Sequence, residues 1–123
     1  MSVSFLFTYA WLKRKYHKQL PFNMPSTFVG EAYTFGSLYK VAEYPGIKLI
    51  GNNKVFGEIY SIDKDFDWIQ MDEFENASPT MKVAPEYRRV KVKCFIGVKE
   101  YQCWIYEFLD EPLQSNRIKS GVF

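Results

Sequence analysis

Apolar and polar residues alternate along much of the chain, which predicts a protein built mainly of β-strands. In residues 89–94, Val90, Val92 and Cys94 alternate with arginine and lysine. Successive side chains of a strand point to opposite faces, so these three residues are expected to face a core while the charged ones face water. Comparable runs, rich in aromatic and β-branched residues, predict further strands at residues 5–9, 28–35, 47–50, 55–62 and 101–108.

Residues that favour turns separate the predicted strands. Tyr44-Pro45-Gly46 is expected to form a tight turn. Residues 51–54, Gly-Asn-Asn-Lys, are expected to join two strands, because glycine and asparagine tolerate positive φ. Residues 19–27 and 77–85 each contain two prolines and are predicted to be loops.

One short helix is predicted at about residues 66–74. Asp63 or Asp65 can cap its first turn, and Asn76 can end it. About six strands with one or two short helices indicate an α+β fold. A mixed sheet with this many strands tends to curl or to close.

The composition indicates a single domain, residues 1–123, in which the C-terminal tail 109–123 either packs over the body or frays. Hydrophobic residues make up 47% and aromatic residues 19%, which predicts a dense core or a deep pocket walled by rings. A net charge of +2 is small for a protein that binds nucleic acid or a membrane surface, so a small-molecule partner is expected.

The apolar segment 3–12 is interrupted by Ser4 and Thr8 and lacks a basic flank, which argues against a signal peptide or a membrane span. A cytoplasmic location is therefore expected.

The cysteines and the histidine indicate no metal or nucleophile site. Cys94 and Cys103 lack the spacing of a zinc site or a redox CxxC motif. A disulfide is conceivable if they lie opposite each other in a hairpin turning near Val98, but two buried thiols are the favoured interpretation. His17 is the only histidine and lies in the basic segment 13–18, which is expected to be solvated.

Glu75, in the carboxylate-rich stretch 70–76, is the best candidate for chemistry. At helical spacing it lies three residues after Asp72, four after Met71 and seven after Trp68, so it shares a face with two large apolar side chains. Partial desolvation and the negative end of the helix dipole both raise the pKa of such a carboxyl group, which suits proton transfer near neutral pH. An ordinary solvated helix residue is the alternative.

Six short motifs follow one another along the chain: FLFTYAWL at 5–12, YPG at 44–46, VFGEIY at 55–60, MDEFE at 71–75, YRR at 87–89 and WIY at 104–106. In this order, the chain from about Phe5 to Phe108 resembles the gamma-glutamylcyclotransferase-like family, which includes gamma-glutamylamine cyclotransferases and plant avirulence-induced proteins. The resemblance implies a small, closed, mixed β-barrel with a pocket at the end of the first strand. It also implies an enzyme that cyclises γ-glutamyl groups to 5-oxoproline, releases an amine and needs no cofactor or metal.

The resemblance assigns roles to individual residues. The family's catalytic glutamate ends a Leu-Asp-x-x-Glu motif, which reads Met71-Asp72-Glu73-Phe74-Glu75 here and maps the role onto Glu75. Glu75 would take a proton from the attacking amine and deliver it to the departing nitrogen. Backbone N–H groups of the loop Tyr9, Ala10, Trp11 and Leu12 would bind the glutamyl carboxylate or carbonyl oxygen.

The substrate loop departs from the family pattern, which is usually Tyr-Gly-Ser-Leu or Tyr-Gly-Thr-Leu. Ala10 replaces the glycine and Trp11 replaces the small hydroxyl residue. A Trp11 ring directed inward would shrink the pocket, whereas one directed outward could grip the leaving amine. Asn76 replaces the glycine that often follows the glutamate, a smaller change because asparagine tolerates the left-handed conformation. A binding or regulatory module without turnover is therefore a second hypothesis, and an interaction protein with an exposed aromatic patch is a third.

Other polar residues have structural alternatives. Asp72 is expected to stabilise a loop or a cap. Tyr9, Tyr87 and Tyr106 either donate hydroxyls into the pocket or, as favoured here, belong to the core. Arg89 either holds a carboxylate or forms a cross-strand salt bridge. The sequence identifies neither the amine that is released nor the oligomeric state.

Overall fold

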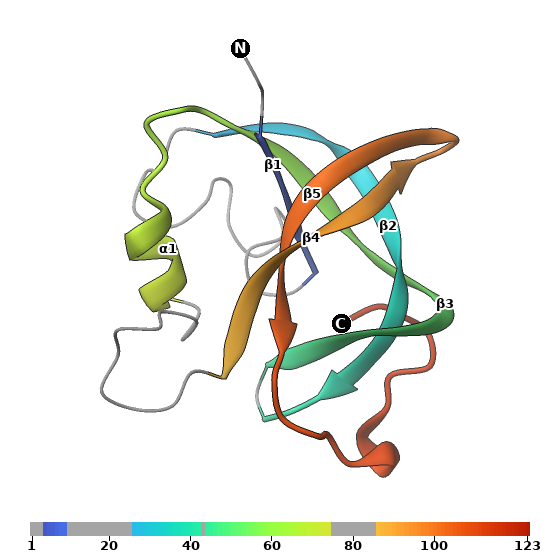
Figure 1. Ribbon diagram of the computed structural model, residues 1–123. Helices are drawn as coiled ribbons and strands as arrows, with labels where there is room; N and C mark the ends of the chain where they lie inside the picture. Colours follow the sequence, from blue (N-terminus) through green and yellow to red (C-terminus); the bar gives the residue numbers. More distant parts are fainter. Residues whose placement is uncertain (1–3, 10–25, 43, 75–85) are drawn as a thin grey trace.

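A computed structural model describes residues 4–9, 26–42, 44–74 and 86–123 of the chain. Within them lie five strands, one α-helix and one 3-10 helix (Figure 1). In chain order these are β1 (Ser4–Thr8), β2 (Ser26–Lys40), β3 (Pro45–Ile62), α1 (Trp68–Phe74), β4 (Tyr87–Ile96), β5 (Lys99–Phe108) and η2 (Gln114–Asn116).

The strands form one sheet that closes on itself in the order β1-β3-β2-β4-β5. Neighbours along this order are antiparallel, and the ring closes where β1 pairs in parallel with β5 through Leu6 and Trp104. A second parallel pairing joins β3 to β5 at Ile47 and Glu107. This closed, mixed strand order agrees with the expected α+β barrel.

The expected number of six strands is wrong, because the predicted strands 47–50 and 55–62 are a single strand, β3. Residues 51–54 were predicted as a turn between two strands, yet they continue β3 in extended conformation. The glycine and asparagines of this segment lie at an irregularity within one strand. Such an irregularity favours residues that tolerate positive φ, as a hairpin turn does.

The irregularity is a bulge of β3 against β2. Gly36 of β2 pairs with Asn53, whereas the next residue of β2 pairs with Lys48. Residues 49–52 are therefore left out of this ladder. Gly51, with a φ of 102°, takes the left-handed conformation that this bulge requires.

β1 crosses β3 at very close range. A Cβ atom at Gly57 would collide with the main-chain carbonyl of Thr8 and with the ring of Phe7. Glycine at this position therefore allows the first strand to lie against β3.

The last two strands form the expected hairpin, which turns at Gly97 and Val98. Cys94 lies opposite Tyr101 rather than opposite Cys103, and both cysteines are free and fully buried. The favoured interpretation of two buried thiols is confirmed. A hydrogen bond with the Cys103 thiol and burial raise the pKa of Cys94 far above its ordinary value, so this thiol stays protonated.

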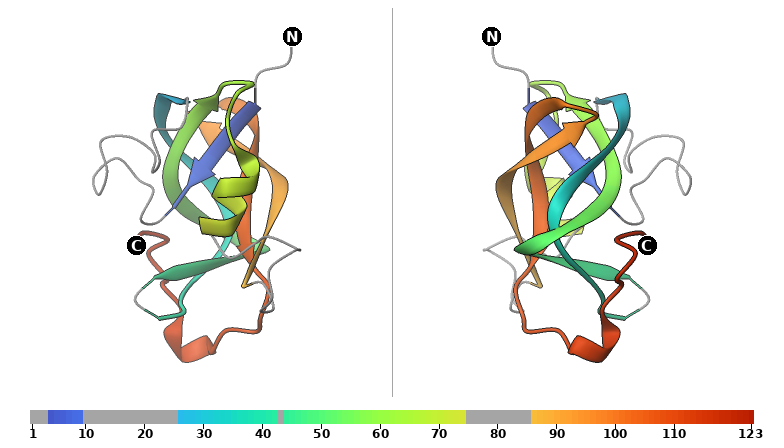
Figure 2. Two further views of the ribbon diagram at one scale, coloured as in Figure 1. Left: turned by 90° about the vertical axis from the view of Figure 1, so that its left-hand side faces the viewer. Right: turned by 90° about the vertical axis from the view of Figure 1, so that its right-hand side faces the viewer.

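Two hydrophobic clusters lie on opposite faces of the sheet, and β1 contributes to both because its successive side chains alternate. The inner cluster draws on all five strands and fills the barrel with Phe7, Tyr9, Ala32, Leu38, Ile47, Val55, Ile59, Cys94, Cys103 and Ile105. The outer cluster comprises Leu6, Tyr60, Ile62, Phe66, Met71, Tyr87, Tyr106 and Phe108. Because Met71 belongs to α1, the helix covers this second face, and Figures 1 and 2 show it lying on the outside of the barrel.

The C-terminal tail, residues 109–123, packs over the body. The Ile118 N–H donates to the Leu38 carbonyl at 2.7 Å, and the Phe56 N–H donates to the Gly121 carbonyl at 2.8 Å. Of the two alternatives left open by the sequence, packing is the one observed.

Candidate active site

Tyr9 directly follows β1 and is the only residue of the predicted substrate loop that the structure describes. Its buried hydroxyl donates to the Tyr106 carbonyl at 2.7 Å and accepts from the Ile47 N–H at 3.2 Å. The hydroxyl thus bonds to two main-chain groups of the barrel. Its side chain belongs to the core, as favoured for the tyrosines.

Asp72, in the last turn of α1, is held by two side chains of the barrel. Arg89 Nε donates to Oδ1 at 2.8 Å and Arg89 Nη2 to Oδ2 at 3.2 Å, and the Tyr106 hydroxyl donates to Oδ1 at 2.7 Å. Asp72 therefore has a structural role, as expected, but it joins the helix to the barrel rather than stabilising a loop or a cap. Arg89 does hold a carboxylate, but the pair joins a helix to a strand rather than two strands.

Arg89 is further fixed between two aromatic rings. Its guanidinium lies 4.2 Å from the centroid of Trp68 on α1 and 4.6 Å from that of Trp104 on β5. Only 23% of its side chain is exposed, so these cation–π contacts are partly desolvated and correspondingly strong. The three side chains clamp the helix onto the outer face of the barrel.

Tyr106 connects the two segments that carry the predicted site residues. Its carbonyl accepts the hydroxyl of Tyr9, which precedes Ala10, and its own hydroxyl binds Asp72, three residues before Glu75. A single position of β5 therefore anchors both the exit of β1 and the last turn of α1. The candidate site is the region next to Tyr106 where the described ends of these two segments, Tyr9 and Asp72, bond to β5.

The helix face expected for Glu75 is the face that packs on the barrel. Met71 is fully buried in the outer cluster and Trp68 packs against it, whereas Ile69 is 73% exposed. Glu75 itself lies outside the described residues. So do Ala10, Trp11, Leu12, the basic segment with His17, and Asn76, and the roles predicted for them stay predictions.

Tyr87 and Tyr44 hold the turn before β3. The Tyr87 hydroxyl donates to the Pro45 carbonyl at 2.7 Å, and the Tyr44 hydroxyl donates to Glu86 Oε1 at 2.8 Å. The bond to Glu86, with some burial, raises the pKa of Tyr44. Tyr87 is thus a core residue, as favoured.

Glu58 is a buried carboxylate that the sequence reasoning did not select. It lies on β3 with 7% of its surface exposed, and its Oε1 accepts from the Tyr60 hydroxyl at 3.2 Å. The available signal was one carboxylate within the apolar run of residues 55–62, at a position that alternation places on the same face as Tyr60 and Ile62. That face carries the outer cluster.

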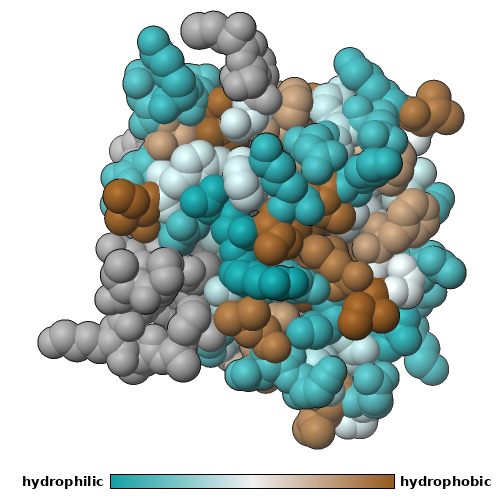
Figure 3. All heavy atoms as spheres, in the orientation of Figure 1, coloured by the Kyte–Doolittle hydropathy of each residue, from teal (hydrophilic) through white to brown (hydrophobic). Residues whose placement is uncertain are grey.

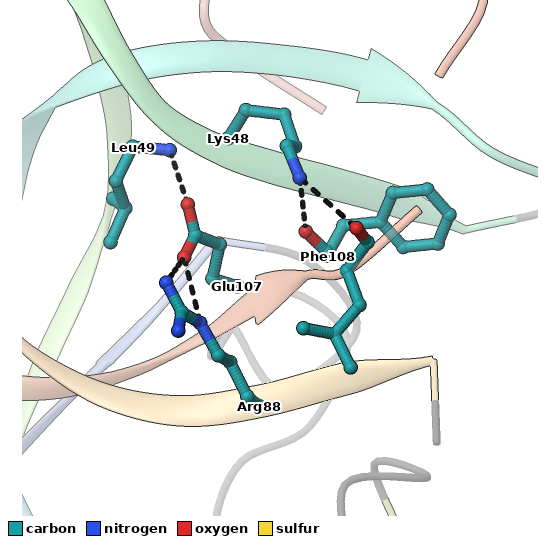
Figure 4. Close-up of polar contacts among 6 residues, drawn as sticks. Lys48, Leu49, Arg88, Glu107 and Phe108 are labelled. Atoms are coloured by element: carbon teal, nitrogen blue, oxygen red, sulfur yellow. Dashed lines mark hydrogen bonds and ion pairs between the residues drawn. The ribbon is translucent and has the colours of Figure 1, made fainter. Parts of the chain in front are cut away.

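Glu107 is a second buried carboxylate, and it joins three strands. It accepts from the Leu49 N–H of β3 at 2.8 Å and from Arg88 Nη2 of β4 at 2.9 Å. Beside it, Lys48 Nζ donates to the Phe108 carbonyl at 2.8 Å (Figure 4). These residues line a hollow of about 560 Å³, and their bonds satisfy polar groups next to the pairing of β3 with β5.

Another hollow, of about 490 Å³, lies over β2 and β3. Its wall combines two carboxylates with aromatic rings, namely Glu31, Glu58, Tyr33, Phe56 and Phe95. Tyr33 stacks on Phe95 at 5.4 Å between centroids. Phe35 and Phe56 are each about two-fifths exposed. Figure 3 shows that apolar side chains also form a band among hydrophilic ones on the face that it displays.

Among the residues with a described position, no group of three or more histidine, cysteine, aspartate or glutamate side chains is arranged to hold a metal ion. Within the same ranges, no helix has the length and apolar character needed to cross a membrane.

Comparison with known proteins identifies one family. The family model described as gamma-glutamyl cyclotransferase, AIG2-like, matches residues 6–123. No curated protein matches the chain by sequence.

Several solved structures share the fold. YkqA from Bacillus subtilis is 21% identical with a TM-score of 0.70, over 99% of this chain and 40% of YkqA, so the chain spans two fifths of that protein's length. PH0828 from Pyrococcus horikoshii is 23% identical with a TM-score of 0.65, over 98% and 89% of the two chains. An AIG2-like protein from Mus musculus is 22% identical with a TM-score of 0.65, over 87% and 78%.

Proposed function

Because the chain belongs to the gamma-glutamyl cyclotransferase, AIG2-like family, we propose that it cyclises a γ-glutamyl amide to 5-oxoproline and releases the amine. The observation that carries the proposal is the double anchorage at Tyr106. Its carbonyl accepts from the hydroxyl of Tyr9, the residue before Ala10, and its hydroxyl donates to Asp72, in the helical turn before Glu75. A site assembled from these two segments needs such a common support, because catalytic groups must be held to within fractions of an ångström.

The reaction joins two ends of one molecule. The α-amino nitrogen forms a bond to the γ-carbonyl carbon, and the bond between that carbon and the amide nitrogen breaks. Holding the glutamyl chain folded in a near-attack geometry supplies much of the acceleration. The protein must then move one proton from the attacking nitrogen to the departing one.

Glu75 is the proposed proton carrier. Helical spacing associates it with Met71 and Trp68, which pack against the barrel, and an apolar setting raises the pKa of a carboxyl group. Main-chain N–H groups of residues 9–12 are the proposed donors for the carbonyl oxygen as negative charge develops on it. We expect this chemistry to need no cofactor and to occur in the cytoplasm.

The proposal is tested by incubating purified protein with γ-glutamyl amines and γ-glutamyl amino acids and measuring 5-oxoproline. Glu75→Gln should lower kcat by about 10²- to 10⁴-fold, the usual contribution of a general acid–base residue. Glu73→Gln, which changes the neighbouring carboxylate of the same motif, is the matched control and should retain activity. Absence of 5-oxoproline across the panel, with correctly folded protein, would contradict the proposal.

A binding or regulatory module is the second candidate, favoured by Ala10 and Trp11 in the place of the family's glycine and small hydroxyl residue. Thermal stabilisation by a γ-glutamyl compound without product would support it, because any ligand that binds the native state raises the unfolding temperature. Measurable turnover would exclude it.

A further inference from the structure

Three polar side chains form a row across the outer face of the barrel, next to the exit of β1. Thr8 of β1 pairs directly with Glu58 of β3, and Glu58 pairs on its other side with Glu31 of β2. Directly opposed residues of antiparallel strands point to the same face, with Cβ atoms about 4.5–5.5 Å apart. Thr8 precedes Tyr9, so the row adjoins the proposed substrate loop.

Two members of the row are buried, and one lacks a hydrogen-bond partner. Thr8 is 3% exposed and Glu58 is 7% exposed. The Thr8 hydroxyl oxygen has no partner among the residues whose positions are described. A buried hydroxyl normally has a hydrogen-bond partner, since leaving it without one costs free energy. This group is suited to a ligand that brings its own polar hydrogens.

The charges of the row favour a cation. Like charges directly opposite each other on neighbouring strands are destabilising, and a bound positive group would relieve the repulsion between Glu31 and Glu58. The three ion pairs recorded between described residues do not involve Glu31; they are Arg88–Glu107, Arg89–Asp72 and Lys93–Glu100.

The adjoining hollow suits an ammonium group in particular. Aromatic rings of Tyr33, Phe56 and Phe95 line it together with the two carboxylates. The Lys54 ammonium already lies 4.4 Å from the centroid of Tyr33, so this surface accommodates such a group. An ammonium carries three donors, enough for a carboxylate and a hydroxyl at once.

We propose that Glu58, assisted by Thr8, binds an ammonium group of the substrate. The identity of the ligand rests on the proposed function, in which two parts of a γ-glutamyl compound offer this chemistry. One is the α-amino group of the glutamyl moiety, and the other is a second amine on the leaving group. Glu58 is a binding residue in this proposal and transfers no proton; an α-ammonium held there releases its extra proton to solvent before the uncharged amine attacks.

Three probes separate the two sources in a calorimetric binding experiment. They are γ-glutamylmethylamide, its analogue glutaric acid monomethylamide without the α-amino group, and the mono-γ-glutamyl amide of 1,4-diaminobutane. Binding is measured in a Glu75→Gln background, so that turnover does not consume the probes, and 5-oxoproline formation by the unmodified protein is measured separately. Glu58→Gln keeps the shape of the side chain and an acceptor for the Tyr60 hydroxyl but removes the charge. Glu111→Gln, on the exposed tail, is the matched control.

Loss of one charge-assisted hydrogen bond is expected to weaken binding by about ten- to a hundred-fold. If the α-amino group is the ligand, Glu58→Gln weakens binding of both γ-glutamyl probes and leaves the glutaric analogue unchanged. If the leaving amine is the ligand, only the diaminobutane conjugate is affected. An equal loss for all three probes, no loss for any, or no binding of any probe before the substitution would overturn the proposal.

Thr8→Val provides a second variant in case Glu58→Gln does not fold, as judged by circular dichroism. It removes only the hydroxyl and should show the same probe selectivity with a smaller loss, about two- to ten-fold. A selective loss without any 5-oxoproline supports the ammonium site while contradicting the proposed enzyme. If 5-oxoproline forms but both variants show no selectivity among the probes, the proposed enzyme is supported and the ammonium site is contradicted.

Discussion

At the scale of single residues, the candidate site depends on side chains that bond to two elements at once. Asp72 could be recognised from the sequence as a structural carboxylate, because it precedes the end of a predicted helix. Its partners, Arg89 and Tyr106, could not be assigned, because both lie on strands distant in sequence. Glu58 was missed for a related reason. Alternation gives the face on which it lies, but its burial depends on the packing of neighbouring strands.

Tyr106→Phe tests the bond between the barrel and α1. The substitution keeps the carbonyl that accepts from Tyr9 but removes the hydroxyl that donates to Asp72. A hydrogen bond to a charged group contributes about 1.5 kcal/mol or more, so the free energy of unfolding should fall by roughly this amount in urea titrations. Tyr101→Phe, on the same strand, serves as the control and should change stability by less than about 0.5 kcal/mol. Equal stability of the two variants would contradict the role given to the Tyr106 hydroxyl.

At the scale of elements, alternation located the strands because period-two burial is a property of each strand by itself. Val92 packs against the inner cluster and Cys94 is fully buried, as the pattern in residues 89–94 predicted. The sequence did not show that the two predicted strands 47–50 and 55–62 form one continuous strand, β3. A glycine and two asparagines permit a hairpin turn and a bulge equally well, and the pairing with β2 decides between them.

Met71→Ala tests whether α1 is held by burial of its apolar face. Met71 is fully buried in the outer cluster, so its truncation should cost about 2–5 kcal/mol of unfolding free energy. Ile69→Ala, on the exposed side of the same helix, should cost under about 0.7 kcal/mol, since alanine is also the better helix former. Thermal and urea unfolding of both variants measure this difference. Similar costs at the two positions would mean that the helix is not packed as described.

At the scale of the whole molecule, the barrel closes through few main-chain pairs, and side chains complete the closure. β3 and β5 pair at a single position, Ile47 with Glu107, and the Glu107 side chain bonds to both Leu49 and Arg88. The strand count predicted a sheet that curls or closes, and the family resemblance implied a closed barrel. The sequence could not predict a buried glutamate at the closure, because Glu107 belongs to a strand whose partners across the barrel are set by the whole topology.

The buried thiols give global stability a defined dependence on pH. The pKa of Cys94 is raised in the native protein by Cys103 and by burial, whereas an unfolded thiol ionises near its ordinary value of about 9. Above that pH the native state binds more protons than the unfolded state, so the contribution present at lower pH is progressively lost as the pH rises. The slope should approach about 1.4 kcal/mol per pH unit.

Urea titrations at pH 8, 9 and 10 measure this slope, with Cys94→Ala as the comparison. The variant should lose less stability between pH 9 and 10 than the unmodified protein, because it lacks one of the two hydrogen-bonded buried thiols. Parallel pH profiles would show that the Cys94 thiol does not remain protonated in the native state.

The bulge at residues 49–52 divides β3 into two ladders that share one backbone. Each ladder has its own register with β2, one ending at Lys48 and the other beginning at Asn53. Additional residues placed between Gly51 and Asn53, where the side chains are exposed, would lengthen the unmatched stretch without reversing which side chains face the core on either side. This interior part of β3 therefore offers a position for a peptide graft, away from the strand end that leads to α1.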